Sequence, residues 1–347
     1  MLSVALLYHL VRRHFGVVAG LLAALALAIS PISVITNRNN TIDSTLVLVM
    51  LLGAWAVQRA AETGKLRWLL LCAVFVGLGF NIKMMEAYLV VPAYGLLYLL
   101  AAPRRIWVRI GQLALAVLLM LSISLSWAVA VDLTPAASRP YVGSSQDNSE
   151  LSLALGYNGI QRLLGQFGFG GGKASSTSGN ATRSFPPAAP GGGTITGGDF
   201  PQPRAGDSGQ PPQGFGSGGG GMFNTGNPGL LRLFNEPLGG QIVWLLPMAL
   251  LGMLALAWQR RPRFREGRQQ QSLNLWGIWL LTMAVFFSAA GFFHQYYLST
   301  LAPAICALFG IGMVVMWKDY RRSGWRGWLL PLALLFTALE QNHILFQ

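Results

Sequence analysis

Three short polar stretches between apolar runs hold ionisable residues that could do chemistry. The first, residues 36–43, contains Arg38 and Asp43. An arginine offers a fork of N–H groups suited to phosphate, and an aspartate beside it can position the arginine or a metal ion. These residues therefore favour an anion site, with a structural ion pair in an interfacial loop as the alternative.

The second stretch contains Lys83 and Glu86, which lie between two apolar runs. Ionisable residues at membrane depth are costly and mark functional sites. The alternative is that Lys83 extends its ammonium to the membrane interface. Because both residues fall on the face opposite the basic loops described below, we expect a functional role.

The third stretch contains His294, Tyr296 and Tyr297. A histidine here could bind a metal or a phosphate, and the tyrosines could line a sugar or lipid pocket. The alternative is an aromatic belt with one satisfied histidine. A zinc site has little support, because no second histidine lies at ligand spacing.

The composition indicates a membrane protein that must position these residues on helices. Of the 347 residues 53% are hydrophobic and only 11% are charged, and the formal charge is +13. We assign the positive charge to cytoplasmic loops and their anionic lipids, and expect no nucleic-acid partner. The fold class that follows is all-α, a polytopic transmembrane helical bundle.

Runs of apolar residues predict nine full spans, since about 20 helical residues cross the hydrocarbon core. A partial helix at the start would make ten, and we expect the chain to begin inside a helix of a longer protein. The predicted spans cover residues 16–35, 43–60, 67–84, 86–102, 107–131, 240–258, 273–293, 296–317 and 325–341.

Lysines and arginines occupy alternate connections, which orients the bundle. A bias of this kind places the basic loops in the cytoplasm, and the three polar stretches then share the extracytoplasmic face. The basic connections hold Arg12 and Arg13; Arg59, Lys65 and Arg67; Arg104, Arg105 and Arg109; Arg260, Arg261, Arg263, Arg265 and Arg268; and Lys318, Arg321, Arg322 and Arg326.

The chain divides into N-terminal transmembrane helices (1–131), an extracytoplasmic loop (132–239) and C-terminal transmembrane helices (240–347). Within the loop, residues 165–229 are dominated by Gly, Pro, Ser, Thr and Gln, which bury too little surface to offset their ordering entropy. We therefore expect that segment to be flexible. The sequence lacks a Walker A loop, a Gly-x-Ser-x-Gly elbow and a His-Glu-x-x-His motif, which disfavours nucleotide-driven transport and cytosolic hydrolysis.

Several motifs together resemble a bacterial family 39 glycosyltransferase of the GT-C superfamily, a group similar to protein O-mannosyltransferases and aminoarabinose transferases. The resemblance runs from about residue 1 to residue 340. The motifs are Ser30-Pro31-Ile32-Ser33-Val34 leading to Asn37-Arg38-Asn39-Asn40 and Asp43, Gly79-Phe80-Asn81-Ile82-Lys83-Met84, Ser138-Arg139-Pro140-Tyr141-Val142-Gly143-Ser144-Ser145, Gly156-Tyr157-Asn158-Gly159, and Phe293-His294-Gln295-Tyr296-Tyr297 with Leu301-Ala302-Pro303.

The resemblance implies a multi-pass enzyme of the bacterial plasma membrane that moves a sugar from a polyprenyl-phosphate donor to a protein, lipid or glycan acceptor on the extracytoplasmic side. It implies that Lys83 and Arg38 meet the donor phosphate and that Asp43 is a supporting acid. His294, Tyr296 and Tyr297 would line the donor cavity, whereas Glu86 departs from the pattern. The main catalytic aspartate of such enzymes would precede Met1. No cofactor is specified, and a divalent metal is left open.

Two other classes of function fit the same sequence. A polyprenyl-lipid transporter or flippase would also place polar residues inside a helical bundle. A catalytically incomplete fragment, or a membrane scaffold that presents the Gly-rich loop, would carry the motifs without the reaction.

Overall fold

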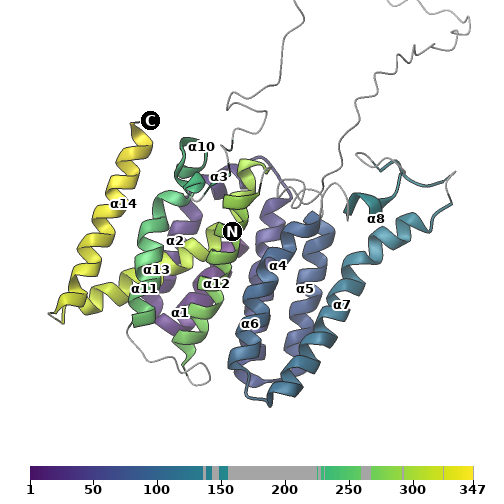
Figure 1. Cartoon of the computed structure of the whole chain (residues 1–347), viewed down its shortest axis with the longest axis horizontal. Helices are drawn as coiled ribbons and strands as arrows, with labels where there is room; N and C mark the ends of the chain where they lie inside the picture. Colours follow the sequence, from purple (N-terminus) through teal and green to yellow (C-terminus); the bar gives the residue numbers. More distant parts are fainter. Residues whose placement is uncertain are drawn as a thin grey trace, which may run out of the picture.

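The chain folds into a bundle of helices that lie roughly side by side (Figure 1). The computed structural model describes residues 1–135, 138–142, 148–154, 225, 228–229, 231–258, 267–290, 293–322 and 324–346, and no β-strand occurs among them. The predicted all-α polytopic fold is confirmed.

The N-terminal half consists of long helices interrupted by one 3-10 segment. These elements are α1 (Leu2–Phe15), α2 (Val17–Ile29), α3 (Pro31–Arg38), α4 (Asp43–Thr63), α5 (Leu66–Lys83), η1 (Met84–Val90), α6 (Val91–Ala101), α7 (Ile106–Asp132) and the short α8 (Glu150–Ser152).

The C-terminal half alternates short turns with further helices. Its elements are η3 (Arg232–Phe234), α10 (Glu236–Gly239), η4 (Val243–Leu245), α11 (Leu246–Trp258), α12 (Arg268–Ala289), η5 (Gln295–Thr300), α13 (Ala302–Tyr320), η6 (Trp325–Trp328) and α14 (Leu329–Leu345).

Helices lie at the predicted spans, but several of them are broken or short. In the part of the chain that is described, five helical stretches are long and apolar enough to cross a membrane, one of them being the 36 residues of α5, η1 and α6 together. A sixth appears if α2 and α3, which meet at a bend of 55°, count as one span. The predicted spans 86–102 and 296–317 begin with the 3-10 segments η1 and η5 rather than with α-helix.

Prolines mark where helices restart after these breaks. Pro31, Pro92 and Pro303 occupy the first or second position of α3, α6 and α13. Proline is favoured there because its missing N–H has no partner in the first turn of a helix, and it cannot continue the preceding helix. Non-helical backbone at membrane depth is tolerated where it lines a cavity inside the protein. A pocket of about 290 Å³ lies beside two of these breaks, since residues of α3 and Ser299 of η5 line it.

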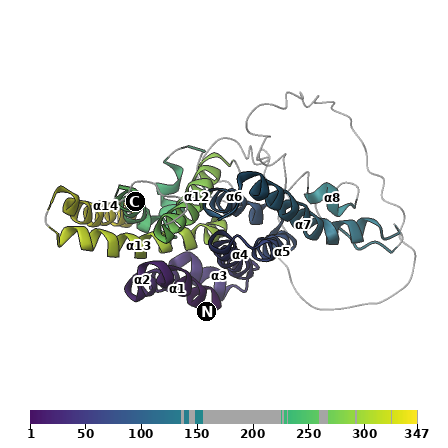
Figure 2. The ribbon, with the colours of Figure 1, turned by 90° about the horizontal axis from the view of Figure 1, so that it is seen from below.

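Small residues let α13 pack closely against its neighbours at the centre of the bundle. Figure 2 shows α13 between α2 and α14. A Cβ atom added to Gly252 of α11 would lie 2.6 Å from the Cα of Gly312, and one added to Gly310 would press on the backbone of Ala19 and Ala23 in α2. Glycine at such crossings lets helix backbones approach in a membrane, where packing replaces the hydrophobic effect.

One buried polar network joins α1, α4 and α12 near their basic ends. Arg13 and His14 both reach Glu62, at 2.6 Å and 3.3 Å. The Nδ1 atom of His14 lies 2.6 Å from the hydroxyl of Ser272. The α4–α5 and α6–α7 connections lie at this same end of the bundle (Figure 1). The basic stretches that follow α1, α4 and α6 thus lie at one end, as the predicted orientation requires of them.

Most of the predicted extracytoplasmic loop lies outside the described residues. This holds for the motif 156–159, for part of 138–145 and for the Gly-rich stretch 165–229 apart from residues 225, 228 and 229. The expected flexibility of that stretch and the three-part division of the chain stay predictions.

Candidate functional site

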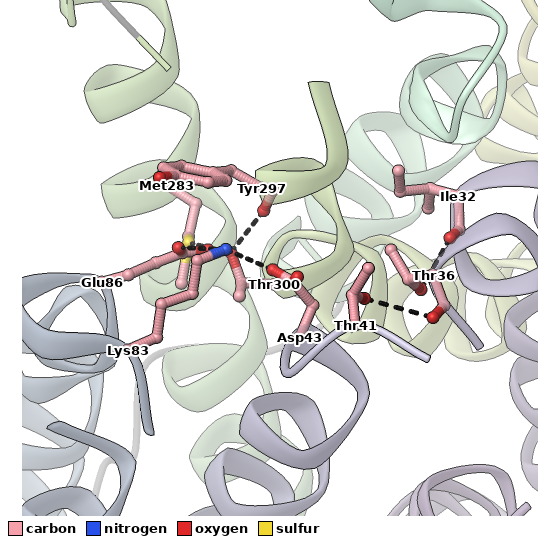
Figure 3. A network of polar contacts seen from close by, with 9 residues as sticks. All are labelled: Ile32, Thr36, Thr41, Asp43, Lys83, Glu86, Met283, Tyr297 and Thr300. Atoms are coloured by element: carbon pink, nitrogen blue, oxygen red, sulfur yellow. Dashed lines mark hydrogen bonds and ion pairs between the residues drawn. The ribbon is translucent and has the colours of Figure 1, made fainter. Parts of the chain in front are cut away.

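Lys83 is the centre of a cluster formed where helices begin, end or break (Figure 3). It is the last residue of α5, and Asp43 is the first residue of α4. Glu86 lies in η1, and Tyr296 and Tyr297 lie in η5. Segments from three distant parts of the sequence therefore meet at one end of the bundle.

Two buried carboxylates hold the Lys83 ammonium. Its Nζ atom lies 2.9 Å from Glu86 Oε2 and donates a hydrogen bond to Asp43 Oδ1. The side chains of Lys83, Asp43 and Glu86 are 11%, 1% and 6% exposed. Burying charges is costly unless they are paired. Two carboxylates share one ammonium, so these three side chains together carry a net negative formal charge.

Aromatic rings cover the ammonium on its other side. Lys83 Nζ lies 3.6 Å from the ring centroid of Tyr297 and 4.8 Å from that of Tyr296. His294 stacks on Tyr296 with centroids 4.8 Å apart and an interplanar angle of 14°. The rings and the lysine form a cation–π arrangement that partly replaces water around the charge.

The tyrosine-bearing segment η5 is anchored at its far end by α12. The indole N–H of Trp279 donates to the carbonyl of Thr300 at 3.0 Å. The hydroxyl of Thr300 donates to the carbonyl of Tyr297 at 2.8 Å and lies 3.5 Å from the sulfur of Met283 (Figure 3). Trp279 and Thr300 are fully buried, so they fix the height of the tyrosines above Lys83.

Arg38 stands apart from this cluster. It lies at the end of α3, is exposed, and lines a pocket of about 290 Å³ together with Asn37, Ser44 and Ser299. Ser44 and Ser299 directly neighbour Asp43 and Thr300 in sequence. The pocket therefore borders the cluster.

Two alternative interpretations of the sequence are wrong. The ion pair between Arg38 and Asp43 does not form, since Asp43 pairs with Lys83 and Arg38 makes no ion pair within the described residues. Lys83 does not extend to the interface, because it is buried between Asp43 and Glu86. Glu86, which departs from the family pattern, turns out to be a direct partner of Lys83.

The structure thus brings Asp43, Lys83, Glu86, Tyr296 and Tyr297 together, with His294 behind the tyrosines. Sequence reasoning missed the anchors Trp279 and Thr300, because both lie in apolar surroundings without any distinctive spacing. It also missed Arg232, which is buried close to the start of η5. A signal existed for Arg232, since a lone arginine in Leu-Leu-Arg-Leu-Phe on the predicted extracytoplasmic side is unusual.

No group of three or more His, Cys, Asp or Glu side chains that could hold a metal ion occurs in the described ranges. The carboxylates closest to the site, Asp43 and Glu86, are both engaged by Lys83. Any metal would have to share them with the ammonium, so metal dependence stays open.

The chain is similar to several known proteins. Residues 1–127 match the family model described as "Dolichyl-phosphate-mannose-protein mannosyltransferase". The chain is 45% identical over 377 residues to "Putative mannosyltransferase YycA" of Bacillus subtilis (strain 168), covering 99% of this chain and 55% of that protein. The chain is therefore similar to proteins named as mannosyltransferases over almost all of its own length. A second protein of that organism, "Putative mannosyltransferase YkcB", is 42% identical over 384 residues, covering 99% of this chain and 54% of its own length.

A solved structure shares the fold of this chain. It is that of ArnT from Cupriavidus metallidurans bound to undecaprenyl phosphate, with a TM-score of 0.53 and 19% identity. The likeness covers 97% of this chain and 47% of ArnT. The chain spans about half the length of each of these relatives.

Proposed function

We propose that this protein is a membrane glycosyltransferase that moves a sugar from a polyprenyl-phosphate donor to an acceptor on the extracytoplasmic side. The observation that carries the proposal is the buried Lys83, held at one end of a GT-C-type bundle between two carboxylates and under two tyrosines. The relatives named as mannosyltransferases, and the ArnT structure bound to undecaprenyl phosphate, support the same class of reaction and donor.

Lys83 would stabilise the phosphate that leaves when the sugar is transferred. Negative charge grows on that phosphate in the transition state, and a fixed cation in a water-poor site stabilises it strongly. An ammonium has three N–H donors, and two of them face Asp43 and Glu86. The third lies under the rings of Tyr296 and Tyr297 in this structure, and it would turn to a phosphate oxygen when those rings move aside. Arg38, in the adjoining pocket, supplies a second positive charge on the approach to the site.

Asp43 would hold the sugar as well as the lysine. Its Oδ2 atom is buried and accepts no hydrogen bond from the described residues. An unsatisfied buried acceptor is costly, so a ligand that donates to it gains affinity. A sugar hydroxyl is such a donor, and Tyr296 and Tyr297 would wall the same space. The acceptor hydroxyl also needs a base to take its proton, and none of the residues named here is assigned that role.

Binding of undecaprenyl phosphate to the purified protein tests the donor site, with the neutral alcohol undecaprenol as the reference lipid. We expect the wild type to prefer the phosphate and Arg38→Ala to lose at least fivefold in affinity. Lys83→Met should lose more. Lys65→Met is the matched control, because Lys65 lies at the opposite end of α5 and is exposed. Equal affinity for the two lipids would refute the phosphate site.

Release of undecaprenyl phosphate from undecaprenyl-phosphate hexoses and pentoses, measured with membrane extracts as the acceptor source, tests the transfer itself. Release by wild type and Lys65→Met, with at least a hundredfold loss in Lys83→Met, supports the proposal. Tight lipid binding without release from any donor would favour the transporter or flippase instead.

A further inference from the structure

Arg232 is the most deeply buried charge that the proposed reaction leaves unused. It is 2% exposed and lies in η3, which follows the Gly-rich stretch. Its guanidinium bonds to backbone carbonyls and one hydroxyl, and among the described residues it has no carboxylate partner. Burying a charge without a counter-ion costs free energy, so the hydrogen bonds to these neutral acceptors must replace the water that the guanidinium loses.

The partners of Arg232 include the C-terminal end of α12. Its Nη1 donates to the carbonyls of Phe287, at 3.3 Å, and of Ala290. The last carbonyls of a helix lack partners within the helix and carry partial negative charge. The guanidinium therefore donates to carbonyls that have no partner within the helix, and its positive charge interacts favourably with the helix dipole. In this way Arg232 caps the C-terminal end of α12.

A second set of contacts ties this helix end to the segments on either side. Arg232 Nε and Nη2 donate to the carbonyl and hydroxyl of Thr225, at 2.8 Å and 2.9 Å. The guanidinium carbon lies 4.6 Å from the ring centroid of Phe293. Phe293 immediately precedes His294. One buried cation thus links the end of the Gly-rich stretch, the end of α12 and the start of the aromatic wall over Lys83.

We propose that Arg232 is a positioning residue for this site: it fixes the height and register of His294, Tyr296 and Tyr297 by locking the α12 terminus and Phe293 to the segment that follows the Gly-rich stretch. It acts through η5 and touches no reacting group. The segment η5 then has two anchors, Arg232 at its start and Trp279 at Thr300. The effect on catalysis rests on the proposed function, whereas the effect on the order of η5 does not.

Arg109 supplies a matched control at the other end of the bundle. It is 3% exposed, and its guanidinium donates to the carbonyls of Leu99 and Arg104 at 2.5 Å and 2.8 Å. Leu99 lies in the last turn of α6. Both arginines therefore close a helix C-terminus with backbone contacts, but only Arg232 adjoins the aromatic wall. A general effect of losing a buried arginine should appear equally in both variants.

Hydrogen–deuterium exchange of the whole protein tests the positioning without relying on activity. In Arg232→Met we expect the amides of Tyr297 and Leu301, which bond to His294 and Leu298, to exchange at least tenfold faster than in the wild type. Arg109→Met should change them less than twofold. Arg232→Lys, which keeps the charge but loses the fork, should fall between and remains informative if the methionine variant does not fold. Unchanged exchange of these amides in both Arg232 variants would overturn the proposal.

Kinetics then separate positioning from simple loss of folded protein. Arg232→Lys should raise the KM for the lipid-linked donor at least fivefold, whereas Arg109→Met should lower only the active fraction and leave KM unchanged. An unchanged KM in Arg232→Lys despite faster exchange would refute the positioning role. If the wild type transfers no sugar at all, the proposed function fails, and affinity for undecaprenyl phosphate replaces KM as the second readout.

Discussion

Removing the Lys83 charge should destabilise the protein far more than removing either of its carboxylate partners. Lys83→Met leaves Asp43 and Glu86 buried and negative, with the shared cation gone. Breaking a buried ion pair by removing one partner costs about 3–5 kcal/mol. Glu86→Gln is milder, since Lys83 keeps Asp43 and the tyrosine rings, and we expect a loss of about 1 kcal/mol, as for an ordinary hydrogen bond.

The decisive result is that the effect of Glu86→Gln on stability changes sign when Lys83 is replaced. In the wild-type background Glu86→Gln should destabilise, but in the Lys83→Met background it should stabilise, because it then removes an uncompensated buried charge. Adding Asp43→Asn should recover most of the remaining loss, since a neutral network of similar shape is often no less stable than an ion pair. Coupling between residues in one network commonly reaches about 0.5–3 kcal/mol.

Unfolding followed by tryptophan fluorescence in one detergent, at one scan rate, measures these differences. At about 2 °C per kcal/mol for a protein of this size, Lys83→Met should unfold about 6–10 °C lower than the wild type. Lys65→Met should unfold within about 1 °C of the wild type, as expected for an exposed residue. The reasoning fails if Glu86→Gln lowers the midpoint equally in both backgrounds, because the carboxylates and the ammonium would then not share one buried network.

Three further outcomes follow from the packing and the polar anchors. Gly252→Ala should destabilise the protein by about 1–3 kcal/mol through overpacking against Gly312, whereas Gly95→Ala, with open space around its Cα, should be neutral or slightly stabilising. Thermal unfolding midpoints compare the two variants, and equal effects would contradict the close crossing of α11 and α13. Trp279→Phe leaves the Thr300 carbonyl unpaired, so the free energy of unfolding should fall by about 1–3 kcal/mol and undecaprenyl phosphate should bind more weakly. Unchanged binding in calorimetry would show that η5 does not need this anchor. His14→Ala breaks the network with Glu62 and Ser272, so it should lower the free energy of unfolding by about 1–3 kcal/mol. Affinity for undecaprenyl phosphate should stay within about twofold of the wild type. A larger loss of affinity would show that the two ends of the bundle are coupled.

The helices could be predicted from the sequence because the thickness of the membrane sets the length of the apolar run that a spanning helix needs. It also placed Asp43, Lys83 and Tyr297 at one face, since alternating basic loops orient every span at once. The segments η1 and η5 escaped prediction because the hydrophobic period cannot distinguish a 3-10 turn from an α-helix within an all-apolar run.

The separation of Arg38 from Asp43 could not be read from the four residues between them. Arg38 ends α3 and Asp43 begins α4, so the two side chains belong to different helices, and Asp43 pairs with Lys83 instead. The role of Arg232 depends on contacts with Phe287 and Phe293, more than fifty positions away. Long-range packing of this kind leaves no periodic trace in a single sequence.

The prolines at the starts of α3, α6 and α13 also limit how many main-chain N–H groups this end of the bundle can offer to an anion. Helix N-termini usually attract phosphates through their free backbone N–H groups. Here each of the three starts lacks one such group, and α4 begins instead with a negatively charged residue, Asp43. Under the proposed function, recognition of the donor phosphate would then depend on the side chains of Lys83 and Arg38 rather than on the main chain, which mutation cannot remove. A single base change at the exposed Arg38 would therefore weaken recognition of the lipid phosphate without disturbing the buried network.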